Sequence, residues 1–401
     1  MPDTDLPARS WQRAWDAQRV HHPRIDRALQ QAWRRPLAVL LPVAAVVSAL
    51  GVEDVRPYDL SWFIDGGRVL TSSRALEVFA DEGLQMGPLY LLLVGVVARV
   101  AELVGLPVMA LVGAVVAVVV VWTADVVARR WAALGGASAP AARWSVGGAL
   151  VVGGILPQVS ASGHQEEVLL AVVLAAAAAS AATGRLGRVG VLLGVGAGVK
   201  AWAVLGGPIV LHGRSWRAAA LGALTAVAGA SVLYGPFLLF GDVRTFDFSW
   251  GIAGGPSALA ALGAGLGLDD WGLRCLQAGA AAIAGAFVAL RRGGTALAVV
   301  VTVVAVRLLL EPIASVYYLA PLVLLTVLWS ATSPARPGPV ARLVILALVP
   351  CTVLHHYLVP TTVSRTIEAL TCVAVLGAVL LLERRRVRAA DASPEPAQAV
   401  P

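Results

Sequence analysis

Two uncharged stretches of the sequence decide the fold: LVGAVVAVVVVW at residues 111–122 and AVVLAAAAASAA at residues 171–182. A helix that crosses a bilayer needs about 20 mostly apolar residues, and both stretches lie within longer apolar runs. Because these runs are continuous rather than alternating, they favour spanning helices over barrel strands. The sequence therefore predicts an all-α, polytopic membrane protein.

The composition points the same way. Of the 401 residues, 58% are hydrophobic and 14% are charged, whereas soluble domains carry about 25% charged residues. Lys200 is the only lysine, and the excess of Arg, Ala, Val and Gly is typical of a high-GC bacterial genome. The arginines stand in short clusters between apolar runs, as the positive-inside rule predicts. We therefore expect a multi-pass protein of the bacterial plasma membrane, in contact with membrane lipids and binding no nucleic acid.

Twelve apolar segments predict about 11–13 transmembrane helices in a membrane domain at residues 37–388. They are residues 37–53, 88–104, 107–127, 146–160, 167–183, 189–211, 218–240, 274–291, 295–310, 317–331, 343–358 and 366–383. Residues 1–36 are polar and contain no signal peptide, so we expect a cytoplasmic N-terminal segment. Residues 389–401 are expected to form a disordered cytoplasmic tail.

Arginine clusters predict the orientation. They precede the first apolar segment and follow the last one, which places both termini in the cytoplasm and requires an even number of crossings. Two further groups conflict with strict alternation: Arg129, Arg130 and Arg143, and then Arg185 and Arg188. Both conflicts disappear if one segment between 88 and 127 does not cross and if 189–211 is a broken or re-entrant segment.

The first external loop, about residues 54–87, is the strongest candidate site. It contains YDLSWFIDGGRVL from Tyr58 and is expected to form short amphipathic helices. Asp59 and Asp65 are six residues apart, so on a helix they point to different faces, and either could act alone as a base. Solvated loop acids are the alternative interpretation. Pro88 predicts the start of the next helix, and a second external loop is expected at about 241–273.

The polar turn SGHQEEVLLA, from Ser162, is the second candidate. His164, Gln165 and Glu166 stand with Glu167 between two apolar segments, and ionisable residues near membrane depth are candidates for function. The alternative is a polar turn at the bilayer edge. The second histidine of a HExxH zinc signature is missing, so we expect no metal here.

Lys200, in LLGVGAGVKAWAV, is the third candidate. A lysine in an apolar run costs about 2.5–3.5 kcal/mol unless it is paired or hydrated, and lysine commonly binds phosphate. The alternative is a lysine that reaches to the interface. The glycines do not have the spacing of a Walker A loop.

The fourth candidate is RLLLEPIASVYYL, from Arg307. Arg307 and Glu311 are four residues apart and can pair on one helix face, and Pro312 is expected to end that helix. Tyr317 and Tyr318 are expected at the outer interface, as either an aromatic belt or part of a polar opening.

Three more residues are weaker candidates: His355, His356 and Arg365. Adjacent histidines on a helix are expected to point to two faces, which makes a poor metal site. The three cysteines have no metal-ligand spacing and predict no disulfide framework. We expect neither a metal nor a cofactor.

The order of these features resembles a known family. YDLSWFIDGG is followed by Gly87-Pro88, by GHQEE before a polyalanine segment, by VGAGVKAWAVLGGPIVLHGRSWR and by YGPFLLFGD. This order is similar to that of polyprenyl-phosphate-sugar-dependent glycosyltransferases of the GT-C superfold, most closely glycosyltransferase family 87, the bacterial membrane mannosyltransferases. The resemblance covers about residues 37–245, and the remainder is similar only in general architecture. Where the family has Gly-Gln followed by Asn, this sequence has Gly163, His164, Gln165 and Glu166.

The resemblance implies an inverting enzyme at the external face. Its donor would be a polyprenyl-phosphate sugar, its acceptor a glycolipid or a cell-envelope glycan, and no cofactor would be needed. Asp59 would be the catalytic base, with Asp65 as the fallback. Lys200 and Arg307 would stabilise the leaving lipid phosphate, and the polar turn with Tyr317 and Tyr318 would line the substrate site.

Two other functions remain open from the sequence. A transporter or flippase of a lipid-linked or small polar substrate would also need many helices and buried charges, although no internal repeat typical of such proteins is visible. A catalytically inactive scaffold of the same fold is the other.

Overall fold

The computed structural model describes residues 22–213, 215–252, 258–291, 294–311, 313 and 315–392. Within these residues the chain is helical, and its only β-structure is a single bridge between Met86 and Lys200. The predicted all-α class is therefore confirmed. Arg214, Arg292 and Pro312 lie outside the described residues, as do positions 1–21 and 393–401.

Eight helical segments in the described residues are long and apolar enough to cross a membrane. They are α3 (Leu37–Val55), α6 (Val108–Gly135), α7 with α8 (Ala139–Val151 and Ile155–Ala161), α9 (Gln165–Ala182), α11 (Trp216–Phe240), α13 (Asp270–Leu290), α16 (Pro339–Leu358) and α17 (Thr361–Ala392). Four shorter apolar helices lie among them: α10 (Leu186–Val199), η2 (Ala201–Gly213), α14 (Ala296–Leu309) and α15 (Leu319–Thr332). Helix α17 includes residues 389–392, where the sequence predicted the start of a disordered tail.

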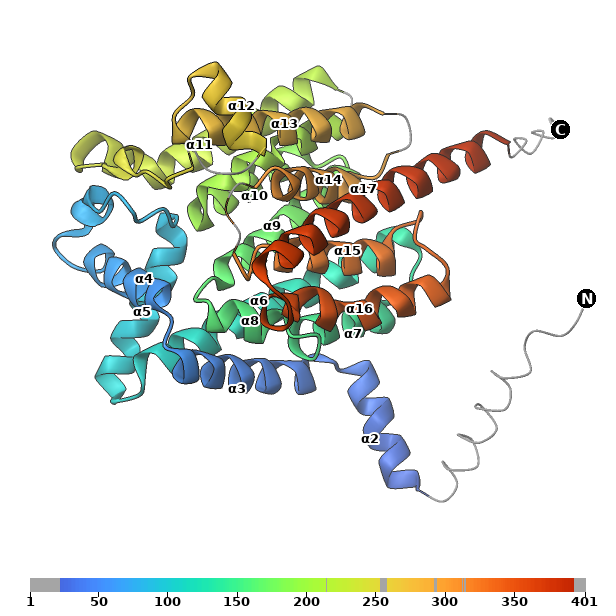
Figure 1. The fold of residues 1–401 in the computed structure, drawn as a ribbon. Helices are drawn as coiled ribbons and strands as arrows, with labels where there is room; N and C mark the ends of the chain where they lie inside the picture. Colours follow the sequence, from blue (N-terminus) through green and yellow to red (C-terminus); the bar gives the residue numbers. More distant parts are fainter. Residues whose placement is uncertain are drawn as a thin grey trace, which may run out of the picture.

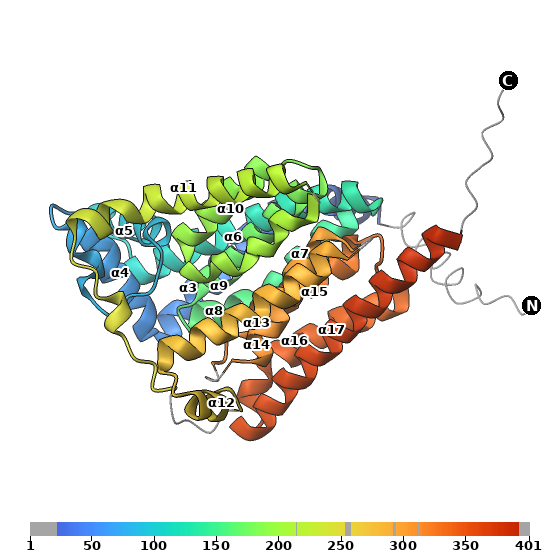
Figure 2. The same cartoon turned by 90° about the horizontal axis from the view of Figure 1, so that it is seen from above.

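Short helices cover one end of this bundle, opposite the end at which α17 finishes (Figures 1 and 2). The segment predicted to be the first external loop forms α4 (Tyr58–Leu70) and η1 (Ala75–Ala80) and is followed by α5 (Pro88–Val104), which begins at Pro88 as predicted. The second loop contains η3 (Thr245–Asp247) and α12 (Ala258–Leu266). A further helix, α2 (Pro23–Arg34), precedes α3 at the opposite end.

Helix α5 explains the first arginine conflict. Gly113, near the start of α6, packs against Val52, near the end of α3. The chain therefore leaves α3 and enters α6 at the same end of the bundle, and α5 between them does not run from one end of the bundle to the other. It packs instead on α4, where a Cβ at Gly67 would lie 2.6 Å from the Gly95 nitrogen. Small residues allow two helix backbones to approach this closely.

The second conflict is explained by a break at Lys200. Residues 189–211 form most of α10 and most of η2, with Lys200 in extended conformation between them (φ −159°, ψ 138°). The α10–η2 hairpin runs out and back beside α9 and returns the chain to the end that carries Arg185. The sequence prediction of a broken segment is therefore confirmed.

Arginines gather at the end of the bundle where α2 lies. Three hydrogen bonds join them to the ends of other helices: Arg143 Nη1 to the Arg34 carbonyl (3.4 Å), Arg130 Nη2 to Thr183 Oγ1 (3.2 Å), and Arg336 Nη1 to the Gly135 carbonyl (2.8 Å). The candidate residues Asp59, His164 and Lys200 lie at the other end.

Candidate functional site

The polar turn and α4 are in direct contact. Gly163, between α8 and α9, has φ +81°, a left-handed conformation that glycine adopts without strain. A Cβ at this position would lie 2.8 Å from the backbone nitrogen of Leu60. The close approach places His164 beside α4, the helix that carries Asp59.

His164 joins two carboxylates. Its Nε2 lies 2.8 Å from Asp59 Oδ2, and its Nδ1 lies 2.8 Å from Glu166 Oε1. A neutral imidazole has only one N–H, so donating to both carboxylates requires the imidazolium form. Burial lowers the pKa of His164, but the charge of Glu166 and the hydrogen bonds to both carboxylates outweigh it and raise the pKa above its ordinary value. The Asp59 side chain is 44% exposed, which leaves it open to a substrate.

Lys200 occupies the centre of the cluster. Its Nζ donates to Glu166 Oε1 at 3.0 Å and to Glu167 Oε1 at 2.7 Å, and both carboxylates are almost completely buried. The segment before α5 fixes the break in the helix, because Gly87 N–H donates to the Val199 carbonyl at 2.9 Å. The two buried carboxylates therefore carry one more negative charge than the single positive charge of Lys200 balances.

Arg307 is held differently. Its Nη1 lies 3.9 Å from Glu167 Oε2 and its Nη2 lies 3.8 Å from Glu311 Oε2, which are ion-pair rather than hydrogen-bond distances. Its guanidinium carbon lies 4.7 Å from the Trp202 ring centroid and 5.5 Å from that of Tyr318. The buried Nη1 makes no hydrogen bond. Arg307 thus retains donor capacity that Lys200 has largely used, and the predicted pairing with Glu311 is confirmed.

Tyr317 covers one side of the cluster, and Arg274 extends it. The Tyr317 ring stacks on His164, with centroids 3.8 Å apart and an interplanar angle of 21°. From α13, Arg274 Nη1 donates to Glu311 Oε1 at 2.6 Å, and Gln277 Nε2 donates to the Arg307 carbonyl at 2.7 Å. With His164 protonated, the cluster contains equal numbers of acids and cations: Asp59, Glu166, Glu167 and Glu311 against His164, Lys200, Arg274 and Arg307.

The structure does not bring every predicted residue into this cluster. Asp65 points to another face of α4, as expected from the six-residue spacing, and pairs with Arg68 at 2.6 Å. Gln165 points toward α6 and α8, where its Nε2 donates to the Gly113 carbonyl at 3.0 Å and to Ser160 Oγ at 2.8 Å. Gln165 therefore anchors the polar turn to α6 and α8.

Four members of the cluster had no assigned role in the sequence prediction. Glu167 was noted only as part of the turn, and Trp202, Arg274 and Gln277 were not singled out. The sequence did contain one indication of Arg274 and Gln277. They stand one helical turn apart at the polar start of an apolar segment. Their convergence with Arg307 depends on the packing of α13 on α14, which the sequence does not reveal.

The chain matches no protein-family model, and no characterised protein is detectably similar to it. The described residues nevertheless define its class: a polytopic, all-helical, multi-pass membrane protein with a buried, charge-balanced cluster at one end. Its activity has to be inferred from the geometry of that cluster.

Proposed function

We propose that the protein transfers a glycosyl group, by preference mannosyl, from a polyprenyl-phosphate sugar to a glycolipid or cell-envelope glycan. One observation carries this proposal: the predicted base and the predicted phosphate-binding cations belong to one cluster. Asp59 from the external loop, His164 from the turn, Lys200 from the helix break and Arg307 from α14 are linked by short contacts. These residues are up to 248 positions apart in the chain (59 to 307).

The arginine distribution supports an external site. Cytoplasmic loops of membrane proteins are rich in arginine. The hydrogen bonds of Arg130, Arg143 and Arg336 to the ends of other helices lie at the end opposite the cluster. We therefore assign the arginine-rich end to the cytoplasm of a bacterial cell and the cluster to the external face of its plasma membrane.

The proposed mechanism is a single inverting displacement. Asp59, the most exposed carboxylate of the cluster, accepts the proton of the acceptor hydroxyl. The hydroxyl oxygen attacks the anomeric carbon, and the bond from that carbon to the phosphate oxygen breaks. The polyprenyl phosphate leaves with the electron pair. The free donor of Arg307 stabilises its developing charge, while Lys200 fixes the two glutamates that position His164 and Arg307.

An apolar groove supports a lipid-linked donor. It lies between α15, α16 and α17, has a cavity volume of about 290 Å³, and is lined mainly by Leu, Val, Ile and Ala side chains. Such a lining suits a hydrocarbon chain. Leu322, which lines the groove from the first turn of α15, follows the 315–318 segment by four residues.

The test is sugar transfer by the purified protein in detergent. Labelled polyprenyl-phosphate mannose is supplied with membrane glycolipids as acceptors, and three variants are compared with wild type. Asp59→Asn is expected to lower kcat by at least about 100-fold, the usual contribution of a general base. Asp65→Asn is the matched control on the same helix and is expected to retain activity. Arg307→Gln is expected to lose most activity because the leaving phosphate is no longer stabilised.

The variants test which residue is the base and whether Arg307 stabilises the leaving phosphate. Loss in Asp65→Asn but not in Asp59→Asn would move the base to the fallback residue. Equal activity in all variants would refute the proposed base and the phosphate site together.

A transporter or flippase is the second candidate, because the buried ion pairs form an unbroken chain from Asp59 to Arg274 and such chains occur in ion-coupled carriers. Reconstituted vesicles distinguish the two functions. Movement of an intact labelled lipid-linked substrate across the bilayer, without bond cleavage, would favour transport.

A further inference from the structure

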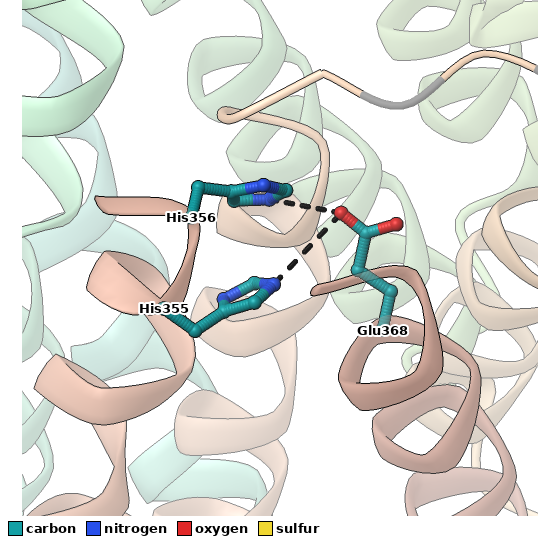
Figure 3. A group of neighbouring side chains, drawn as sticks. All are labelled: His355, His356 and Glu368. Carbon is teal, nitrogen blue, oxygen red and sulfur yellow. Dashed lines mark ion pairs between the residues drawn. The ribbon is translucent and has the colours of Figure 1, made fainter. Parts of the chain in front are cut away.

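Three side chains converge where α16 turns into α17. His355 and His356 lie in the last turn of α16, and Glu368 lies in the second turn of α17. His356 Nε2 is 2.8 Å and His355 Nε2 is 3.9 Å from Glu368 Oε1 (Figure 3). Adjacent histidines on a helix were expected to point to different faces. They do not: their ring centroids are 4.0 Å apart, and both rings face the same carboxylate oxygen.

Hydrogen bonds at the two Nδ1 atoms fix the orientation of the imidazole rings. His355 Nδ1 lies 2.7 Å from the Thr352 carbonyl, which can only accept, so Nδ1 carries the proton and Nε2 of the neutral ring presents a lone pair. His356 Nδ1 lies 2.7 Å from Ser364 Oγ. The other ring nitrogens therefore point inward, toward Glu368 Oε1.

The inward-facing atoms are in ion-pair contact with one another but make no hydrogen bond. His355 Nε2, His356 Nε2 and Glu368 Oε1 are all buried, and none of them makes a hydrogen bond. The two histidine side chains are only 4% and 8% exposed. Buried polar atoms without partners are rare and unfavourable. Three potential acceptors that face one another favour a bound cation between them.

We propose that His355, His356 and Glu368 bind a divalent transition-metal ion of the zinc class. All three ligand atoms lie within 4.8 Å of one another. Zinc–ligand bonds of about 2.0–2.1 Å in a tetrahedron place ligand atoms about 3.3 Å apart, and the two contacts to Glu368 lie on either side of this value. Two imidazoles and a carboxylate suit zinc-class ions rather than calcium or magnesium.

The surroundings of the three ligands match a metal site in two further respects. Metal-binding imidazoles usually form a hydrogen bond through their other nitrogen, as both rings do here. Among the described residues, no fourth His, Cys, Asp or Glu joins the group, so water or an external ligand would complete the coordination.

The ion would fasten the α16–α17 hairpin beside the candidate site. Gln158 Nε2 in α8 donates to the Val353 carbonyl, two residues before His355, and to the Val316 carbonyl. Val316 precedes Tyr317, which stacks on His164. The metal site and the charged cluster are thus connected through one buried glutamine. The proposed metal is independent of the glycosyl-transfer proposal.

The test measures metal binding to the full-length protein, purified in detergent without a polyhistidine tag. After chelator treatment, the protein is titrated with Zn²⁺ against a chromophoric chelator, and Co²⁺ is used as an absorption probe. Wild type is expected to bind one tight equivalent. His355→Gln, His356→Gln and Glu368→Gln are each expected to weaken binding by at least about tenfold. His164→Gln is the matched control, because His164 also contacts two carboxylates, and should bind zinc within about twofold of wild type.

A second measurement guards against misfolded variants. Zn²⁺ should raise the Tm of wild type and of His164→Gln, but not that of His356→Gln. Glu368→Asp retains the charge, elutes as a monodisperse peak if folded, and should still bind more weakly. Absence of stoichiometric binding to wild type at micromolar Zn²⁺, or equal binding by wild type and all three ligand variants, would overturn the proposal.

Discussion

Lys200→Met tests whether the buried charges are mutually stabilised. Lys200 is 13% exposed and donates to two carboxylates that are 0% and 1% exposed. Methionine keeps most of the side-chain volume and removes the charge, so Glu166 and Glu167 lose their shared cation. Removing one partner of a buried ion pair destabilises a protein by about 3–5 kcal/mol. With an unfolding entropy of about 2.1 cal/mol/K per residue, this lowers the Tm of a chain of this length by about 4–6 °C.

Thermal unfolding in detergent, followed by tryptophan fluorescence, measures this loss. Arg74→Met is the matched control, because Arg74 pairs with Glu77 on the surface, with side chains 68% and 52% exposed. An exposed pair contributes about 0–1 kcal/mol, so the control should shift the Tm by about 1 °C or less.

A charge-balanced double variant sharpens the test. Glu166→Gln combined with Lys200→Met removes one negative and one positive charge, and Glu167 still accepts from Trp202 Nε1 at 3.0 Å. We expect the double variant to recover about 1–3 kcal/mol relative to Lys200→Met. The reasoning would be refuted if Lys200→Met were no more harmful than Arg74→Met, or if the second substitution added to the loss.

Three further predictions concern the turn, the pH dependence and the end of the bundle opposite the charged cluster. Gly163→Ala should lower the Tm more than Gly105→Ala, since both glycines have positive φ, which disfavours alanine by about 1 kcal/mol, but only Gly163 approaches another backbone closely; equal shifts would contradict the close contact. Because the pKa of His164 is raised in the folded state, its stabilising contribution is complete below the ordinary value of 6.5 and is lost as pH rises through the folded pKa. The Tm of wild type should therefore fall more steeply than that of His164→Gln as the pH rises above about 6.5, and parallel profiles would argue against a charged imidazole. Glu383→Ala should destabilise by about 2–4 kcal/mol in chemical or thermal unfolding, because it leaves the buried donors of Thr295 and Trp329 without their shared acceptor. A loss below about 0.5 kcal/mol would show that water replaces the carboxylate.

The sequence by itself determined the class of the protein and the places where polarity is unusual. Long uncharged runs must be helices in a bilayer, because no water is present to satisfy backbone groups. Single ionisable residues within or beside those runs, such as Lys200, His164 and Arg307, were recognisable because burying a charge is unfavourable without a partner. Asp59 and Asp65 were correctly placed on different faces by helical geometry alone.

Only the tertiary structure decided which of these residues meet. The left-handed turn at Gly163 places His164 against α4 and separates the environment of Asp59 from that of Asp65. Arg274 joins the cluster across α13 and α14, and Gln165 leaves it. Likewise, His355 and His356 share one carboxylate because α17 folds back along α16. Sequence periodicity specifies the face of a single helix. Distances between helices depend on how side chains of distant segments pack together, and that information is spread over the whole chain.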